Sequence, residues 1–166
     1  MKDTMDQTMD DIELGELLDE LRRRGKTVTT AESCTGGLLA GRITDIPGSS
    51  DVFHQGFVTY CDRAKHKLLQ VKKKTLKRYT AVSRQTAKEM AKGGAKAAGA
   101  GYALSVTGYA GPPSGDGDDS VGLVYIGCFY EGRTRVQKCH FTGTRTSIRR
   151  QSVETALSLL RSCIAE

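Results

Sequence analysis

One short unit limits the possible folds of this chain more than any other, a strand that runs through a glycine pair directly into a helix. Residues 26–32, KTVTTAE, are rich in β-branched side chains and predict a strand. Residues 38–46, LLAGRITDI, predict a helix that stops at Pro47-Gly48. Strands that alternate with helices in this way are typical of α/β folds.

The rest of the chain continues the alternation and closes with a hairpin. Further helices are predicted at 9–24, 62–71, 84–99 and 146–164, and further strands at 52–60, 102–108, 121–130 and 134–141. This order predicts a three-layer α/β/α sandwich on a mixed, mostly parallel sheet. We expect residues 1–11 to be an acidic tail and residues 12–166 to form a single domain.

The charge of the chain is uneven. It carries 25 Lys and Arg against 19 Asp and Glu, and residues 1–20 hold eight of the acids but one base. The remaining chain is therefore strongly basic and can attract phosphate. No apolar run is long enough to predict a membrane span, and the acidic N-terminus is not a signal peptide, so we expect a cytoplasmic protein with no membrane partner. The five scattered cysteines are read as reduced thiols rather than as a metal site.

Candidate site residues follow three of the predicted strands. Ser33 and Thr35 follow the first, Tyr60 ends the second with Lys65 just inside the next helix, and Thr107 and Gly108 end the third. In open α/β sheets, sites lie beyond the carboxyl ends of the strands. If the three strands are parallel, these residues meet at one edge of the sheet.

Ser33 and Cys34 are adjacent potential nucleophiles. A catalytic cysteine usually needs a histidine, but His54 and Tyr60 would lie roughly 20 Å apart on one strand, and neither His66 nor His140 is well placed. A serine can instead be served by a lysine. This favours Ser33 weakly, since each of these residues taken alone is more often structural.

Gly36 and Gly37 precede the helix that begins near residue 38. The free N–H groups of a helix N-terminus can hold a phosphate or an oxyanion. The alternative reading is a simple glycine turn.

Several segments together resemble the CinA C-terminal domain family: AESCTGG at 31–37, the pair Tyr60 and Lys65, TGYAGP at 107–112, VGLVYI at 121–126 and FTGTRTSIRRQSVETAL at 141–157. The similarity covers about residues 12–164. The chain departs from the family pattern at Cys61, at Tyr109 and in the acidic loop that follows.

The resemblance implies a three-layer α/β/α fold and hydrolysis of the amide of nicotinamide mononucleotide to nicotinate mononucleotide and ammonia, without metal or cofactor. It implies that Ser33, Lys65 and Tyr60 are catalytic. Thr35, Gly36, Gly37, Thr107 and Gly108 would line the substrate pocket, and Arg145 and Arg149 would bind the substrate phosphate. From the family alone we also expect a homodimer.

Two other functions remain open at the level of sequence. The lysine-rich run from Lys65 to Arg78 could bind nucleic acid weakly and without sequence preference, but aromatic residues that would stack on bases are sparse there, with only Tyr79. A solvated helix face explains the run at least as well. The chain could also be a catalytically silent family member that serves as a binding partner.

Overall fold

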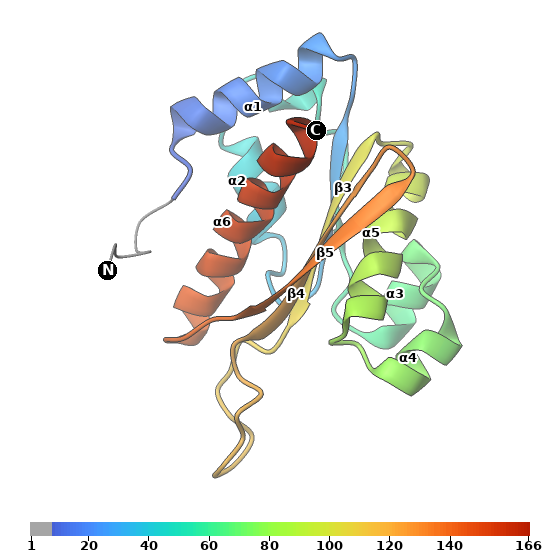
Figure 1. Ribbon diagram of the computed structural model, residues 1–166, viewed down its shortest axis with the longest axis vertical. Helices are drawn as coiled ribbons and strands as arrows, with labels where there is room; N and C mark the ends of the chain where they lie inside the picture. Colours follow the sequence, from blue (N-terminus) through green and yellow to red (C-terminus); the bar gives the residue numbers. More distant parts are fainter. Residues whose placement is uncertain (1–7) are drawn as a thin grey trace.

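The computed structural model describes residues 8–166 and shows three layers, with a mixed sheet between two groups of helices (Figure 1). The strands are β1 (Val28–Glu32), β2 (Phe57–Val58), β3 (Tyr102–Gly108), β4 (Leu123–Tyr130) and β5 (Arg133–His140). The helices are α1 (Asp11–Arg23), α2 (Leu38–Thr44), α3 (Asp62–Leu69), α4 (Lys73–Tyr79), α5 (Arg84–Ala98) and α6 (Arg145–Ile164), with a 3₁₀ turn at Ser49–Asp51. The α/β/α sandwich predicted from the sequence is confirmed.

The order of strands in the sheet is β2-β1-β3-β4-β5. β1 pairs in parallel with both β2 and β3, whereas β3–β4 and β4–β5 are antiparallel. The carboxyl ends of β2, β1 and β3 therefore lie side by side. Residues that follow these three strands meet at this edge, as the sequence predicted.

Two unequal clusters of apolar side chains fill the spaces on either side of the sheet. The larger lies under α1, α2 and α6, and is built on Leu14, Leu39, Ile126 and Leu157. The smaller contains Leu69 of α3, Leu76 of α4 and Met90 of α5. Because α3 is held in the smaller cluster, the position of that helix depends on close packing against α5.

The prediction of one continuous strand over 52–60 is wrong. Only Phe57 and Val58 join the sheet, because the preceding residues contact β1 through isolated bonds, from Val28 N to Val52 O and from Thr29 Oγ1 to Gln55 O. A Cβ atom on Gly56 would lie 2.5 Å from Thr30 Oγ1, so the chain passes β1 too closely for an ordinary ladder.

The helix α4 has no counterpart among the predicted elements. Its N-terminus is capped from a distance by Glu89 of α5, whose carboxylate accepts from the N–H of Lys72 and from Thr75 Oγ1, each at 2.8 Å. A cap that lies 14 or 17 residues away leaves no local pattern such as a capping box. The stability of this short helix therefore depends on α5.

We predict that Gly93→Ala destabilises the protein, because the new Cβ would lie 1.8 Å from Leu69 O at the end of α3. The cost should be about 1 to 3 kcal/mol or more of unfolding free energy. Gly41→Ala is the matched control, since no atom lies within 4 Å of its Cβ and alanine in a helix gains about 0.5 to 1 kcal/mol over glycine. Urea denaturation compares the two variants, and equal stability would contradict this account of α3 packing.

Candidate active site

A cavity of about 220 Å³ opens at the carboxyl ends of β2, β1 and β3. Six of the predicted site residues line it: Ser33, Tyr60, Lys65, Thr107, Gly108 and Arg145. The other lining residues are Cys34, Cys61, Asp62, Ala81, Val82 and Ala110. The predicted residues Thr35, Gly36, Gly37 and Arg149 do not line this cavity.

Ser33 and Lys65 form the centre of the cavity. Ser33 directly follows β1 and is fixed by its N–H, which donates to Val106 O of β3 at 2.9 Å. Lys65 reaches it from the second turn of α3, with 3.0 Å between Lys65 Nζ and Ser33 Oγ. The amine also donates to Thr59 O at 2.9 Å. A hydroxyl and an amine are thus held at the distance needed for proton transfer.

The Lys65 side chain is almost completely buried, with 2% of its surface exposed. This burial lowers the pKa of the amine, because a charged ammonium loses its hydration. Asp62, one turn earlier on α3, partly offsets the shift because its negative charge favours the ammonium.

Cys34 has a different environment from Ser33. The thiol is buried, and this raises its pKa to about 11, since burial disfavours the thiolate. At neutral pH the sulfur is therefore protonated and is a poor nucleophile. Among the described residues no histidine lines the cavity, and His66 instead contacts Val71 O through Nδ1. The geometry supports Ser33 rather than Cys34 as the nucleophile.

Tyr60 and Arg145 lie at the mouth of the cavity. Tyr60 is 62% exposed, and its hydroxyl accepts a hydrogen bond from Arg145 Nη2 at 2.9 Å. Arg145 Nη1 donates to Gly111 O at 2.6 Å, so the guanidinium connects the loop after β3 with the residue after β2. Arg145 is the first residue of α6, where the helix dipole adds positive potential. This rim can bind an anion.

The proposed anion site at Gly36 and Gly37 is already filled by a side chain. The carboxylate of Glu32, buried at the end of β1, accepts hydrogen bonds from the N–H groups of Gly37, Leu39 and Ala40 at 3.2, 2.9 and 3.0 Å. Glu32 therefore occupies the N-terminus of α2. The two glycines are required for the turn itself, with φ values of +57° and +103°.

Arg149 lies one turn after Arg145 on α6, and its guanidinium donates hydrogen bonds to backbone carbonyls of the protein itself. Nε donates to Cys34 O at 3.0 Å and Nη2 donates to Thr35 O at 2.9 Å. The arginine thus supports the loop that carries Ser33. Thr35 is fully buried, and its Oγ1 has no hydrogen-bond partner among the described residues.

Thr107 and Gly108 position the opposite wall. Thr107 Oγ1 donates to Ala81 O at 2.7 Å and so holds the segment between α4 and α5 against the cavity. A Cβ on Gly108 would lie 2.6 Å from Val124 Cγ2 and 2.7 Å from Leu123 O. Glycine is therefore needed there for β3 to pack against β4.

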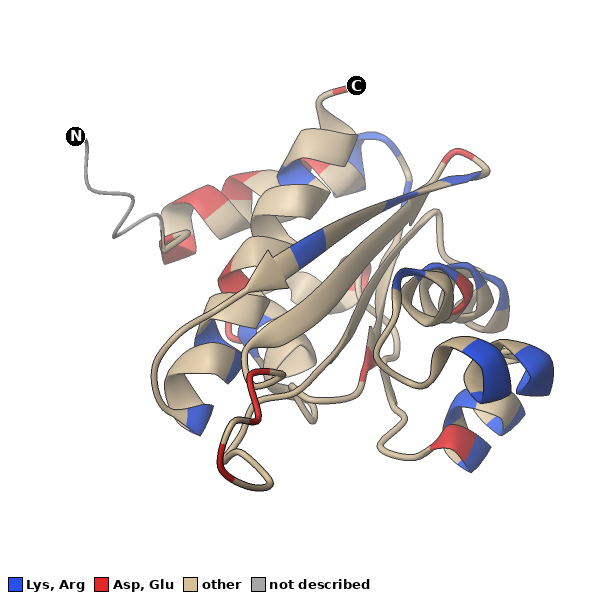
Figure 2. Cartoon of the chain, turned by 60° about the horizontal axis from the view of Figure 1, so that its bottom comes forward, with Lys and Arg blue, Asp and Glu red and all other residues tan. Residues whose placement is uncertain are grey.

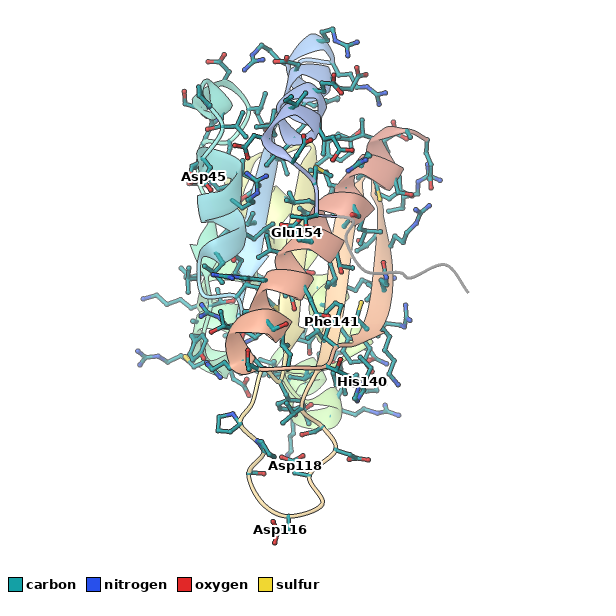
Figure 3. The ribbon with its side chains drawn as sticks, turned by 90° about the vertical axis from the view of Figure 1, so that its left-hand side faces the viewer. Asp45, Asp116, Asp118, His140, Phe141 and Glu154 are labelled. Atoms are coloured by element: carbon teal, nitrogen blue, oxygen red, sulfur yellow. The ribbon has the colours of Figure 1, made fainter. Side chains whose placement is uncertain are left out.

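Two features near the site are separate from the cavity. A larger open groove of about 1570 Å³ runs between α2 and α6, lined by residues that include Asp45, Phe141 and Glu154 (Figure 3), but not by Ser33 or Lys65. The acidic loop after β3 carries Asp116 and Asp118 on a segment that projects beyond the end of the sheet (Figure 3).

The described residues also bear on other classes of site. In residues 8–166 no group of three or more His, Cys, Asp or Glu side chains could hold a metal ion. Within the same residues, every helix is too short or too polar to cross a membrane. All five cysteines are free.

Sequence reasoning missed Glu32 and Thr59. Glu32 belongs to the AESCTGG segment but was not assigned a role, although a carboxylate ahead of a helix N-terminus is a recognisable signal. Thr59 acts through its backbone carbonyl, for which side-chain identity gives no signal. Asp62 is the first helical residue of α3, where the predicted helix 62–71 also begins, and the N-cap position is Cys61.

Comparison with known proteins gives one consistent result. The family model described as the CinA C-terminal domain matches residues 13–164. A competence-damage inducible protein of Clostridium botulinum strain Loch Maree is 49% identical over 141 residues, which is 85% of this chain and 34% of that protein. The chain therefore spans about a third of the length of the curated relatives it matches.

Solved structures are similar over nearly the whole chain. The competence/damage inducible protein from Agrobacterium tumefaciens has a TM-score of 0.88 and 41% identity, and the match covers 98% of this chain and 100% of that chain. A CinA superfamily protein from Escherichia coli has a TM-score of 0.88 and 34% identity, with 95% and 92% covered.

Proposed function

The chain belongs to the CinA C-terminal domain family, and we propose that it hydrolyses the carboxamide of nicotinamide mononucleotide to nicotinate mononucleotide and ammonia. One observation carries the proposal: the buried Lys65 amine lies 3.0 Å from Ser33 Oγ in a cavity whose rim holds Arg145. A nucleophile with an adjacent base is the arrangement that covalent acyl transfer requires.

The reaction proceeds in two halves. The neutral Lys65 amine accepts the Ser33 hydroxyl proton while Oγ attacks the amide carbonyl carbon. The resulting ammonium then donates that proton to the leaving nitrogen, the C–N bond breaks, and ammonia departs from a Ser33 ester. In the second half Lys65 accepts a proton from water as the water oxygen attacks the carbonyl carbon of the ester. The ammonium then returns this proton to Ser33 Oγ while the ester C–O bond breaks, which releases the carboxylic acid and leaves the free serine beside a neutral amine.

Thr59 O keeps the amine aligned through both halves. A neutral amine has two N–H donors and one lone pair. One N–H bonded to Thr59 O leaves the lone pair available to face the Ser33 hydroxyl. The carbonyl also stabilises the ammonium that forms, so the amine does not leave the site when it gains a proton.

The oxyanion of the tetrahedral intermediate needs a donor close to Ser33. The N–H of Gly36 already donates to Ser33 O, and those of Gly37, Leu39 and Ala40 donate to Glu32. We therefore assign the role to the N–H of Cys34, since the residue after a nucleophile commonly supplies this donor.

The size of the cavity fits the nicotinamide ring better than the whole nucleotide. At about 220 Å³ it lies below the roughly 300 to 1,000 Å³ typical of sites that enclose a drug-sized ligand. The ribose phosphate would then remain at the mouth. There Arg145 can give up its hydrogen bonds to Gly111 O and to the Tyr60 hydroxyl, which are both neutral, and bind the phosphate instead.

Ser33→Ala should lower ammonia release from nicotinamide mononucleotide by roughly three orders of magnitude or more, because no other group takes over the attack. Cys34→Ala should retain activity within about tenfold, since the protonated, buried thiol takes no part in the reaction. Thermal denaturation of both variants controls for folding. Loss of activity in a folded Cys34→Ala variant together with an active Ser33→Ala variant would refute the assignment.

Arg145→Ala should raise the KM for nicotinamide mononucleotide by about 10- to 100-fold, as expected when a charge-assisted hydrogen bond is lost. Its activity on the unphosphorylated riboside should match that of the unmodified protein. Arg149→Ala, the matched control on the same helix, should mainly lower kcat through the Ser33 loop. If Arg149→Ala alone shows the phosphate-specific rise in KM, Arg149 and not Arg145 holds the phosphate.

A further inference from the structure

The layer formed by α3, α4 and α5 is far more basic than the rest of the molecule. Residues 62–98 contain twelve Lys and Arg but two acidic residues. All of these basic side chains except Lys65 are exposed. Figure 2 shows the Lys and Arg positions, in blue, gathered on the helices that cover one face of the sheet, at the right of the view.

Within residues 8–166, the exposed basic side chains of this layer form no ion pair with a carboxylate. The ion pairs in residues 8–166 involve arginines of α1, α2, β5 and α6 and of the segment that follows α1. Of the two acids in the layer, Glu89 is used to cap α4, and Asp62 lies beside the cavity. The layer therefore presents a positive charge that no carboxylate of the described residues pairs with.

The apolar content of the layer is low. Its exposed large hydrophobic residues are Leu68 and Tyr79, and the guanidinium of Arg78 lies over the Tyr79 ring, 5.2 Å from its centre. A surface that inserts into a lipid bilayer needs a continuous apolar face. A surface that stacks unpaired bases needs several free aromatic rings. Neither is present in the described residues of this layer.

We propose that this surface, the exposed Lys and Arg side chains of residues 62–98, binds the phosphate backbone of double-stranded nucleic acid without sequence preference. Its cations are mostly lysines, which act as point charges and do not select a base. Spaced phosphates along a duplex match cations distributed over three helices. The surface lies outside the cavity, so the inference does not depend on the amide hydrolysis.

The test uses the full chain and a fluorescein-labelled DNA duplex of about 20 base pairs and mixed sequence. A duplex of this length offers several phosphates to the cations of the surface at the same time. Fluorescence anisotropy measures affinity between about 50 and 200 mM salt. The first variant is K73Q/K74Q/K77Q on α4. The control is K26Q/R150Q/R161Q, which removes the same net charge from outside the basic surface. Thermal denaturation and circular dichroism confirm that both variants fold.

The unmodified protein should bind the duplex, with an affinity that falls more than tenfold over this salt range and does not change with sequence. The α4 variant should bind more weakly, and its salt dependence should be shallower by about one unit of slope for each contacting lysine lost. The control should bind like the unmodified protein. Equal weakening in both variants, no binding at low salt, or preferential binding to vesicles that contain phosphatidylserine would each overturn the proposal.

Discussion

Burial of the Lys65 amine between Ser33 Oγ and Thr59 O is the interaction on which the rest of the site depends. A lysine in water is almost entirely charged at neutral pH and cannot accept a proton. Desolvation is the largest cause of the lowered pKa, and it outweighs the opposing charge of Asp62. The fold must therefore keep α3 tightly against the sheet. The close approach of Gly93 to Leu69 O shows how α5 does so.

Ser33, the proposed nucleophile, is also fixed by several contacts. β1 is buried along its whole length and ends at Glu32, directly before Ser33, and the turn that follows is fixed from two sides. The carboxylate of Glu32, in β1, accepts hydrogen bonds from N–H groups at the N-terminus of α2. Arg149 of α6 donates hydrogen bonds to the carbonyls of Cys34 and Thr35. The sheet and the helix α6 thus both fix this loop. This arrangement leaves the cavity mouth to Arg145 and Tyr60, which remain exposed and available to a substrate.

The fold class and the meeting of Ser33, Tyr60, Lys65 and Thr107 at one edge could be predicted, because strand periodicity and the rule for parallel strands are local and general. Features that depend on contacts between residues far apart in the sequence could not be predicted. The cap that Glu89 gives α4 and the interruption of the strand near Gly56 arise from tertiary contacts. Arg145 and Arg149 look equivalent in the sequence, and only their positions on α6 separate a rim residue from one that supports the loop. The predicted acidic tail lies mostly outside the described residues, and the predicted homodimer remains a prediction.

The most direct test of the central claim is the pH dependence of kcat/KM for nicotinamide mononucleotide. If neutral Lys65 is the base, the rate should be low while the amine is protonated and should rise with pH through an apparent pKa well below 10.5, the ordinary value, because burial lowers it. Lys65→Arg keeps the charge but cannot act as a base, so it should lack both the activity and the rise. The account would be contradicted by a Lys65→Arg variant that retains substantial activity with the same pH profile.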